Sequence, residues 1–275
     1  MVPLRTTKEV SERLRRLEIP FNRFGVDPYG ISRRHLRVAL SWLVWFYENY
    51  FDVHVHGIEK VPPRGRAMLV GNHAGGVALD GAMVVASMFM AKEPPRLAQG
   101  MAEKFLNSVP IFSEWTNRCG HFTGLPEHAI KLLEDDRLLL VFPEGARGTA
   151  KLYKDRHSLV RFGTGFMRLA LRTKSPICPF AFVGGGEAIP TIFNAKRIAK
   201  LVGVPYIPVT PYLVTFPLPV RLDVLYGEPM HFEGDGNEND EVIFGYVEQV
   251  RQRIADLIDE GRKLRRKKRA LEAGK

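Results

Sequence analysis

The chain has 275 residues, of which 45% are hydrophobic, 10% aromatic and 25% charged. This composition excludes wholesale disorder and fibrous repeats, and the length allows one large domain or two small ones. Its two cysteines, Cys119 and Cys178, are too few to staple such a fold and form no C-x-x-C motif. They are expected to be free thiols in a reducing compartment.

The formal net charge of +10 is concentrated at the two ends of the chain. Residues 1–37 carry a net charge of +5 and residues 251–275 carry +6, whereas residues 38–250 carry −1. Basic ends beside apolar helices suit an anionic membrane surface. Specific nucleic-acid binding is not expected, although the basic tail at 262–269 leaves nonspecific RNA binding as a minor alternative.

The first fifty residues predict two amphipathic helices, one over Thr7–Ile19 and one from the N-cap Ser32 to about Tyr50. No apolar segment resembling a secretory signal precedes them. The apolar stretch 38–51 has 14 residues, fewer than the roughly 20 that span a bilayer. Two interpretations of the second helix remain open. Its apolar stripe is typical of a core face, whereas its paired tryptophans and arginine collar favour contact with a membrane.

The rest of the chain alternates apolar strands with amphipathic helices, which predicts an α/β fold with a mostly parallel central sheet flanked by helices. Strands are predicted at 52–56, 67–71, 96–99, 119–123, 137–142, 177–183 and 220–226. Helices are predicted at 77–90, 126–135 and 163–172, with a long basic C-terminal helix from 239 that frays from 263. We divide the chain into a helical pair (1–51), an α/β domain (52–238) and a C-terminal helix with its tail (239–275).

One candidate catalytic pair follows the apolar strand 67–71. His73 leaves the carboxyl end of this strand, where ligands of open α/β sheets bind, and Asp80 follows seven residues later. A histidine oriented by a carboxylate is a common general base near neutral pH. A histidine with a purely structural role remains the alternative.

A second loop, at the end of the strand 137–142, offers further polar groups. The sequence Phe142-Pro143-Glu144-Gly145 is followed by Arg147. The carboxylate suits a substrate hydroxyl, and the guanidinium suits an anionic group. A turn with a surface salt bridge is the simpler alternative.

Together and in this order, the two loops resemble the glycerolipid (lysophospholipid) acyltransferase superfamily, with its motifs Asn-His-x4-Asp and Phe-Pro-Glu-Gly-x-Arg. The resemblance covers about residues 52–230 and includes the ending Gly227-Glu228-Pro229. The family spacing would place aspartate at Ala78 instead of Asp80, as if two glycines were inserted. This pattern is similar to the mono- and diacylglycerol acyltransferase-like branch. The phosphate-binding motif Gly-x-Phe-x-x-Arg also lacks its arginine in the sequence 120–124.

The resemblance implies a peripheral enzyme on the cytoplasmic side of a membrane, acting on an acyl donor and a lipid acceptor. His73 would take the proton of an acceptor hydroxyl that attacks acyl-CoA or acyl-carrier protein, and Asp80 would orient His73. Glu144 and the Gly145 backbone would hold the acceptor, and Arg147 or Lys104 would hold any phosphate. The resemblance implies no metal and no cofactor beyond the acyl co-substrate. A weakly catalytic or non-catalytic lipid-binding protein and an acyl thioesterase remain the alternatives.

Overall fold

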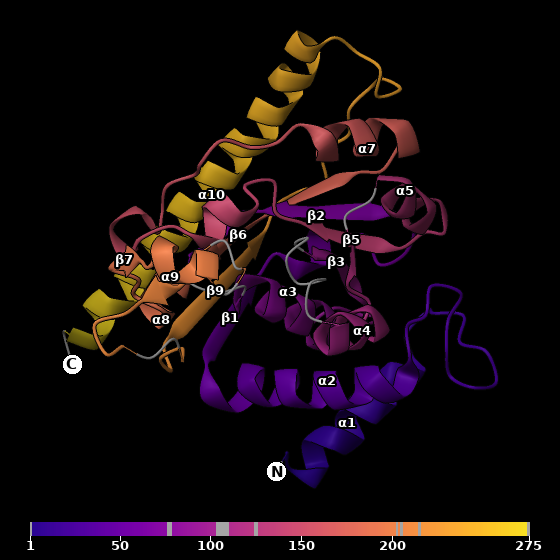
Figure 1. Cartoon of the computed structure of the whole chain (residues 1–275), viewed down its shortest axis with the longest axis horizontal. Coiled ribbons are helices and arrows are strands. Elements are labelled where there is room, and N and C mark those ends of the chain that lie inside the picture. Colours follow the sequence, from indigo (N-terminus) through magenta and orange to yellow (C-terminus); the bar gives the residue numbers. More distant parts are fainter. Residues whose placement is uncertain are drawn as a thin grey trace.

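The computed structural model describes residues 2–75, 79–102, 110–123, 126–201, 203, 206–213 and 216–273. Within these residues the chain forms an α/β fold around a seven-stranded sheet, in the order β1-β9-β6-β2-β5-β3-β4 (Figure 1). The predicted fold class is therefore confirmed. The strands are β1 (Asp52–His56), β2 (Ala67–Gly71), β3 (Ala98–Ala102), β4 (Phe122–Thr123), β5 (Leu138–Val141), β6 (Ile177–Val183) and β9 (Arg221–Tyr226).

Every neighbouring pair in this sheet is parallel except β6 and β9. The apolar runs of β2, β5 and β6 are buried along their whole length because helices cover both faces of the sheet. Successive residues of a strand face opposite sides. Ala67 and Leu69 therefore join one apolar cluster, whereas Met68 and Val70 join the other.

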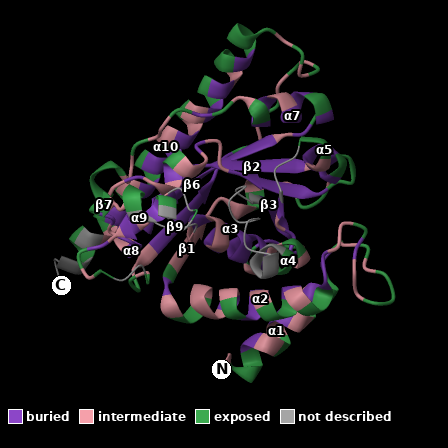
Figure 2. Ribbon diagram, viewed as in Figure 1, coloured by how far each residue is buried: buried purple, intermediate pink, exposed green. Residues whose placement is uncertain are grey.

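Three longer helices lie against one face of the sheet. They are α5 (Pro126–Glu134), α7 (Gly165–Thr173) and α10 (Asp240–Ala273), whose buried apolar side chains share a cluster with Met68 and Val70 (Figure 2). The other face packs against α3 (Leu79–Met90), and α1 (Leu4–Arg15) and α2 (Arg33–Trp45) lie beyond it. The remaining helices of the described residues are η1 (Phe46–Tyr50), η2 (Ile58–Lys60), α4 (Pro110–Arg118), α6 (Ala146–Thr149), η4 (Tyr153–Asp155), α8 (Gly185–Ala188) and α9 (Lys196–Leu201).

The stripe of α2 serves the core on one side and meets solvent on the other. Leu36, Leu40 and Val44 are buried in the same cluster as β2, whereas Trp42 and Val38 are exposed. The buried face of α2 thus fits the interpretation as a core helix, whereas its exposed face leaves contact with a membrane as an expectation. No helix among the described residues is long and apolar enough to cross a bilayer.

Several parts of the chain differ from the sequence-based expectation, among them the helices α4 and α6, which were not predicted. The segment between β6 and β9 folds into α8, α9 and a small hairpin of β7 (Phe193–Asn194) and β8 (Pro208–Val209), none of which was predicted. Strands of two residues leave no detectable alternation in a sequence. The helix α10 also continues to Ala273 and does not end in a frayed tail at Lys263.

Buried ion pairs explain why α10 continues. The Arg265 guanidinium donates to the carbonyl of Arg221 (2.7 Å) and to the carboxylate of Asp223 (3.1 Å) on β9. Asp223 is fully buried, and Arg221 also donates to it at 2.6 and 2.9 Å, while His56 Nε2 lies 3.1 Å away. Burial raises the pKa of Asp223, but hydrogen bonds from Arg221, His56 and Arg265 outweigh it and hold the pKa below its ordinary value.

Asp223→Asn is therefore expected to lower the free energy of unfolding by about 3 kcal/mol at pH 7, because it leaves buried guanidinium groups uncompensated. A lowered folded-state pKa stabilises the protein above the unfolded value, near pH 4, and that stabilisation is lost as pH falls through the folded value. The difference between variant and wild type should thus shrink in acid. Urea denaturation over a pH series measures it.

Asp52→Asn is the matched control on the same edge of the sheet. Asp52 contacts His54 (2.9 Å) and Lys268 (3.5 Å), but its side chain is 57% exposed. Its loss should cost less than about 1 kcal/mol. Equal effects of the two substitutions would show that burial does not set the strength of this cluster.

Candidate active site

The carboxyl ends of three adjacent parallel strands bring the predicted loops together. In the order β6-β2-β5, the strand β2 leads into Asn72 and His73, β5 leads into the Phe142–Gly145 loop, and β6 leads into α8. Side chains that follow neighbouring parallel strands meet at one edge of the sheet. Residues far apart in sequence therefore share one buried site.

His73 and Asp80 form a direct hydrogen bond, with 2.9 Å between Nδ1 and Oδ2. Asp80 lies in the first turn of α3 and also accepts the backbone N–H groups of Ala74 (2.9 Å) and Gly81 (2.7 Å). The positive end of the helix dipole stabilises a carboxylate there. The two additional residues between His73 and Asp80 thus do not separate the pair, and both side chains are buried.

Hydrogen bonding to Asp80 fixes which nitrogen of His73 carries the proton. A carboxylate only accepts, so Nδ1 is the protonated nitrogen and Nε2 keeps its lone pair. No described residue hydrogen-bonds to Nε2. This arrangement gives a base that is oriented from one side and open to a substrate on the other.

Packing against Phe142 and Gly148 determines how the His73 ring lies. The ring stacks on Phe142, with centroids 3.9 Å apart and planes 11° from parallel. A Cβ on Gly148 would lie only 2.8 Å from His73 Cβ and 2.7 Å from Glu144 Cβ. Gly148 therefore allows the two loops to approach, a role that the sequence analysis missed.

Glu144 lies in the same site but faces protein donors. Its Oε1 accepts the backbone N–H of His73 (3.0 Å) and a hydrogen bond from Lys151 Nζ (2.9 Å). Its Oε2 accepts the N–H of Val160 (2.9 Å) and lies 2.6 Å from Lys151 Nζ. These contacts fill the four acceptor positions of a carboxylate, and Glu144 is 1% exposed. The geometry therefore does not support the expectation that Glu144 holds acceptor hydroxyls.

Lys151 is the main residue of the site that sequence reasoning did not identify. Its ammonium group also donates to the His73 carbonyl at 2.8 Å, so it binds both loops. Burial lowers the pKa of Lys151, and the Glu144 carboxylate opposes that shift. A single lysine beyond the Phe-Pro-Glu-Gly sequence gives no periodic or motif signal, which is why the sequence did not reveal it.

The rest of the second loop is engaged in backbone structure or faces solvent. Gly145 has φ of 56°, a conformation that favours glycine, and its N–H donates to the Phe142 carbonyl at 3.1 Å. The Pro143 carbonyl accepts the N–H of Gly163 at 2.9 Å. Arg147 is exposed and donates to the carbonyl of Arg161 at 3.1 Å.

Two further residues with basic side chains are Lys104, which the resemblance assigns to a phosphate, and His121. Lys104 lies outside the described residues. His121 is described: burial lowers its pKa, and its Nδ1 has no hydrogen-bond partner within the described structure. It follows neither of the strands that carry His73 and Glu144.

Asn72, which precedes His73, fastens β2 to β6. Its amide donates to the Phe182 carbonyl (3.1 Å) and accepts the Phe182 N–H (2.8 Å). Ala74 lies close to Gly185 of α8, where an added Cβ would come within 2.6 Å. Asn72 therefore fixes the direction in which the chain leaves β2.

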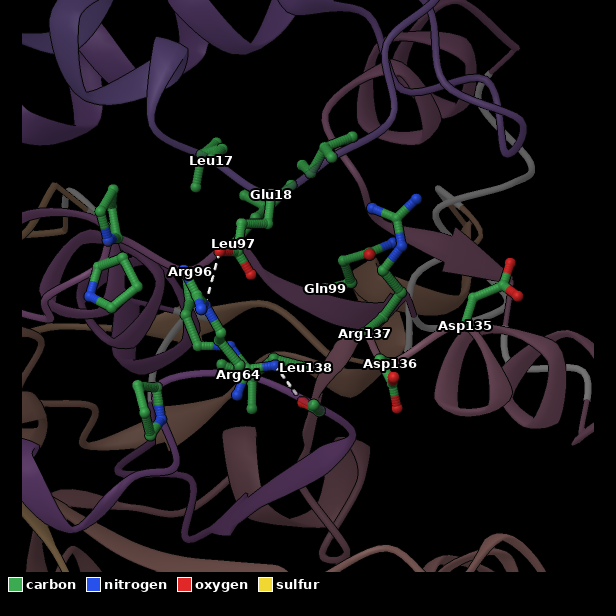
Figure 3. A pocket seen from close by; sticks show the side chains of 15 residues that line it. Leu17, Glu18, Arg64, Arg96, Leu97, Gln99, Asp135, Asp136, Arg137 and Leu138 are labelled. Atoms are coloured by element: carbon green, nitrogen blue, oxygen red, sulfur yellow. Dashed lines mark hydrogen bonds and ion pairs between the residues drawn. The ribbon is translucent and has the colours of Figure 1, made fainter.

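A cavity of about 300 Å³ opens near the amino ends of the strands, opposite the ends that carry the candidate site (Figure 3). The residues lining it come from the segment after α1, from the turns before β2, β3 and β5 and from the first residues of β3 and β5, and they include Arg64, Arg96 and Arg137. Because His73 follows the carboxyl end of β2, this cavity is separate from the candidate site. Within the described part of the chain, no cluster of three His, Cys, Asp or Glu side chains is arranged to hold a metal ion.

Comparisons with known proteins agree with this geometry. A family model described as Acyltransferase matches residues 52–183. An uncharacterized protein of Mycobacterium tuberculosis is 33% identical over 245 residues, which cover 86% of this chain and 67% of that protein. A Bos taurus protein named DGAT1/2-independent enzyme synthesizing storage lipids is 26% identical over 181 residues, 65% of this chain and 52% of that protein.

The fold also resembles a solved enzyme. The crystal structure of the 1-acyl-sn-glycerophosphate (LPA) acyltransferase PlsC from Thermotoga maritima aligns with a TM-score of 0.57 at 17% identity. The alignment covers 83% of this chain and 81% of that one, and at this identity it concerns the fold alone. With the matching family model and the Mycobacterium relative, the chain belongs to the glycerolipid acyltransferase superfamily.

Proposed function

We propose that the protein transfers a fatty acyl group from a thioester donor to the hydroxyl of a glycerolipid acceptor. The observation that carries this proposal is the 2.9 Å hydrogen bond from His73 Nδ1 to Asp80 Oδ2, at the carboxyl end of β2. The unusual spacing of His73 and Asp80 would favour a weakly catalytic lipid-binding protein if it separated the two side chains. The hydrogen bond removes that argument.

In the proposed reaction His73 acts as a general base and then as a general acid. Its Nε2 takes the proton of the acceptor hydroxyl while the oxygen attacks the thioester carbonyl carbon. The tetrahedral adduct then expels the thiolate, which takes the proton from the imidazolium, leaving an ester and a free thiol. Asp80 keeps the proton on Nδ1 and stabilises the imidazolium formed in between.

Glu144 and Lys151 act on this chemistry by positioning the base. Their buried pair binds the N–H and the carbonyl of His73, so the backbone of the base is held from both sides. Phe142 then holds the ring by stacking. Such restraint lets the base meet the hydroxyl without further reorganisation.

The proposed acyl donor is a thioester, and this determines what else the reaction needs. The acyl carbon of a thioester is already activated, so alignment of a base suffices and the proposal includes no metal or cofactor. Both acyl-CoA and acyl-carrier protein supply this group. Comparing the two as donors in one assay determines which is used.

Among the described residues, the cations near the site are engaged in contacts within the protein, which favours an uncharged acceptor such as a monoacylglycerol or diacylglycerol. Lys151 is buried and paired with Glu144, and the exposed Arg147 donates to the carbonyl of Arg161. The sequence 120–124 also lacks the arginine of the phosphate-binding motif. The name of the Bos taurus relative, which refers to storage lipids, supports the same class.

The α1–α2 pair would place this enzyme on the surface of a membrane. Trp42 and Val38 project from α2 with 48% and 41% of their surface exposed, and Arg33, Arg34 and Arg37 are exposed on the same helix. An exposed tryptophan with a basic collar suits the headgroup region of an anionic bilayer. The cytoplasmic face remains the predicted side.

Replacing His73 by alanine should lower acyl transfer by about 100- to 10,000-fold, the usual contribution of a general base. Asp80→Asn should have a similar effect, because an amide in place of the carboxylate favours the wrong tautomer of His73. Transfer of labelled acyl groups from acyl-CoA to monoacylglycerol, lysophosphatidate and water measures this. Transfer to water alone would indicate a thioesterase.

Arg147→Ala serves as the control, since Arg147 is exposed and contacts neither His73 nor Asp80. It should retain transfer to monoacylglycerol. Full turnover by His73→Ala would eliminate the proposed base. Preference of the wild type for lysophosphatidate would eliminate the proposed acceptor class.

Glu144→Gln should destabilise the protein by about 3–5 kcal/mol, because it leaves the Lys151 ammonium buried and uncompensated. Combining it with Lys151→Met should cost less than the sum of the two single substitutions. Urea denaturation and the acceptor KM are measured for all three variants. A raised KM with unchanged stability would instead show that Glu144 binds the acceptor.

Trp42→Ser should weaken binding to vesicles of phosphatidylcholine and phosphatidylglycerol without unfolding the chain, since half of this side chain already faces water. Replacing Arg33, Arg34 and Arg37 by glutamine should remove about 1 kcal/mol of binding per charge on these vesicles and little on pure phosphatidylcholine. Co-sedimentation measures both effects. Arg251→Gln, on α10, is the matched control for charge, and unchanged binding of the α2 variants would contradict docking through this helix.

A further inference from the structure

The segment 188–220, between α8 and β9, exposes an unusual number of large apolar side chains. These side chains are Ile192, Phe193, Leu213, Phe216 and Leu218. Leu213 is 83% exposed, and the other four are between 40% and 54% exposed. Single exposed apolar residues need no explanation, but a group of them on one short segment indicates a binding surface.

Backbone conformation strengthens this point at Leu213. The residue has φ of 60°, in the left-handed region that disfavours side chains other than glycine, asparagine and aspartate. Its N–H donates to the Thr210 carbonyl at 3.0 Å, which closes a tight turn. The turn thus presents a leucine to solvent at a position where neither burial nor local conformation favours it, and such outliers cluster at functional sites.

The charge of the segment indicates what it contacts. Residues 188–220 contain three basic residues and no aspartate or glutamate. The three are Lys196, Arg197 and Lys200, all exposed on α9. Apolar side chains beside cations, with no acidic residue, complement an anionic lipid surface, where the apolar groups enter the acyl region and the cations remain among the headgroups.

The same surface continues onto the end of the N-terminal helical pair. The Phe216 ring lies 5.7 Å from the Tyr50 ring and 6.5 Å from the Phe46 ring, and Tyr50 Oη donates to the Pro217 carbonyl at 2.7 Å. Both rings belong to η1, which directly follows α2 (Figure 1). The exposed Trp42 lies one turn before Phe46 on this continuous helix. The 188–220 segment and α2 can therefore meet one surface together.

The segment is also bound to the part of the chain that carries Lys151. The Asn194 amide donates to the Ala150 carbonyl at 2.7 Å, and the Tyr153 N–H donates to the Thr191 carbonyl at 2.8 Å. Lys151, which holds His73, lies between these two anchors. The hairpin of β7 and β8 thus has a fixed position relative to the candidate active site.

We infer that the 188–220 segment is a second membrane-binding surface, which inserts its exposed apolar side chains into an anionic bilayer beside the site. It acts with α2, so the protein rests on lipid through two separate elements. A lipid acceptor then passes from the bilayer to His73 without crossing water. This last step rests on the proposed acyl transfer, whereas the membrane contact itself does not.

The test is a triple variant, Ile192→Ser, Phe193→Ser and Leu213→Asn. All three side chains are more than half exposed, and asparagine tolerates the left-handed backbone at 213, so the melting temperature should be unchanged. Partition onto vesicles of phosphatidylcholine and phosphatidylglycerol should fall about tenfold or more, because several apolar side chains no longer enter the bilayer. Acyl transfer to a vesicle-borne acceptor should fall in parallel, and transfer to a water-soluble short-chain acceptor should not.

A second variant isolates the cations. Lys196→Gln with Arg197→Gln and Lys200→Gln should weaken partition onto the vesicles that contain phosphatidylglycerol and leave partition onto pure phosphatidylcholine unchanged. The matched control is Val242→Ser with Phe244→Ser, two exposed apolar residues at the start of α10, the end of that helix that lies away from β7 (Figure 1). The control should bind vesicles as the wild type does.

The outcomes separate this inference from the proposed function. Unchanged partition of the triple variant overturns the inference, as does a change of oligomeric state by light scattering with vesicle binding intact, which would identify a protein interface. If the wild type transfers no acyl group from any donor while the triple variant still loses vesicle binding, the surface stands and the proposed reaction fails. If the control loses as much binding as the triple variant, the membrane contact is not specific to this segment.

Discussion

The buried pair of Glu144 and Lys151 is the interaction on which the candidate site depends. It lies between two loops that follow neighbouring strands, and it binds both the N–H and the carbonyl of His73. An isolated buried charge is very costly, so each of these residues requires the other. The carboxylate of the Phe-Pro-Glu-Gly sequence therefore determines where His73, the proposed base, lies, although its own oxygens accept hydrogen bonds from protein groups.

The same arrangement explains how charge is distributed around the base. Asp80 and Glu144 supply two buried carboxylates, and Lys151 supplies one buried ammonium. An imidazolium forming on His73 thus meets a net negative surrounding, at a depth where water screens little. Asp80 acts on the ring through a hydrogen bond, whereas Glu144 acts on the backbone. Orientation and charge stabilisation are in this way divided between two carboxylates.

Much of this architecture could be predicted, because parallel strands buried on both faces leave continuous apolar runs such as 67–71 and 177–183. The pairing of His73 with Asp80 could be suspected but not established, since glycines between them permit many loop paths. Lys151 could not be predicted, because nothing in the sequence distinguishes a buried lysine from an exposed one. The continuation of α10 beyond Lys263 could not be predicted for a related reason. Arg265 lies in a basic run typical of solvent-exposed sequence, yet its partner Asp223 is 42 residues away.

The charges buried around His73 and the charges exposed on α2 have different roles. The body, residues 38–250, carries a net −1, and its buried charges around His73 and Asp223 are paired inside the protein. The cations of α2 are exposed, and at physiological ionic strength their field decays within about 8 Å. They can therefore attract an anionic surface that comes close to α2, while the charges around His73 stay paired inside the protein. The exposed cations can thus orient the protein on a lipid surface, while the buried charges keep His73 in place.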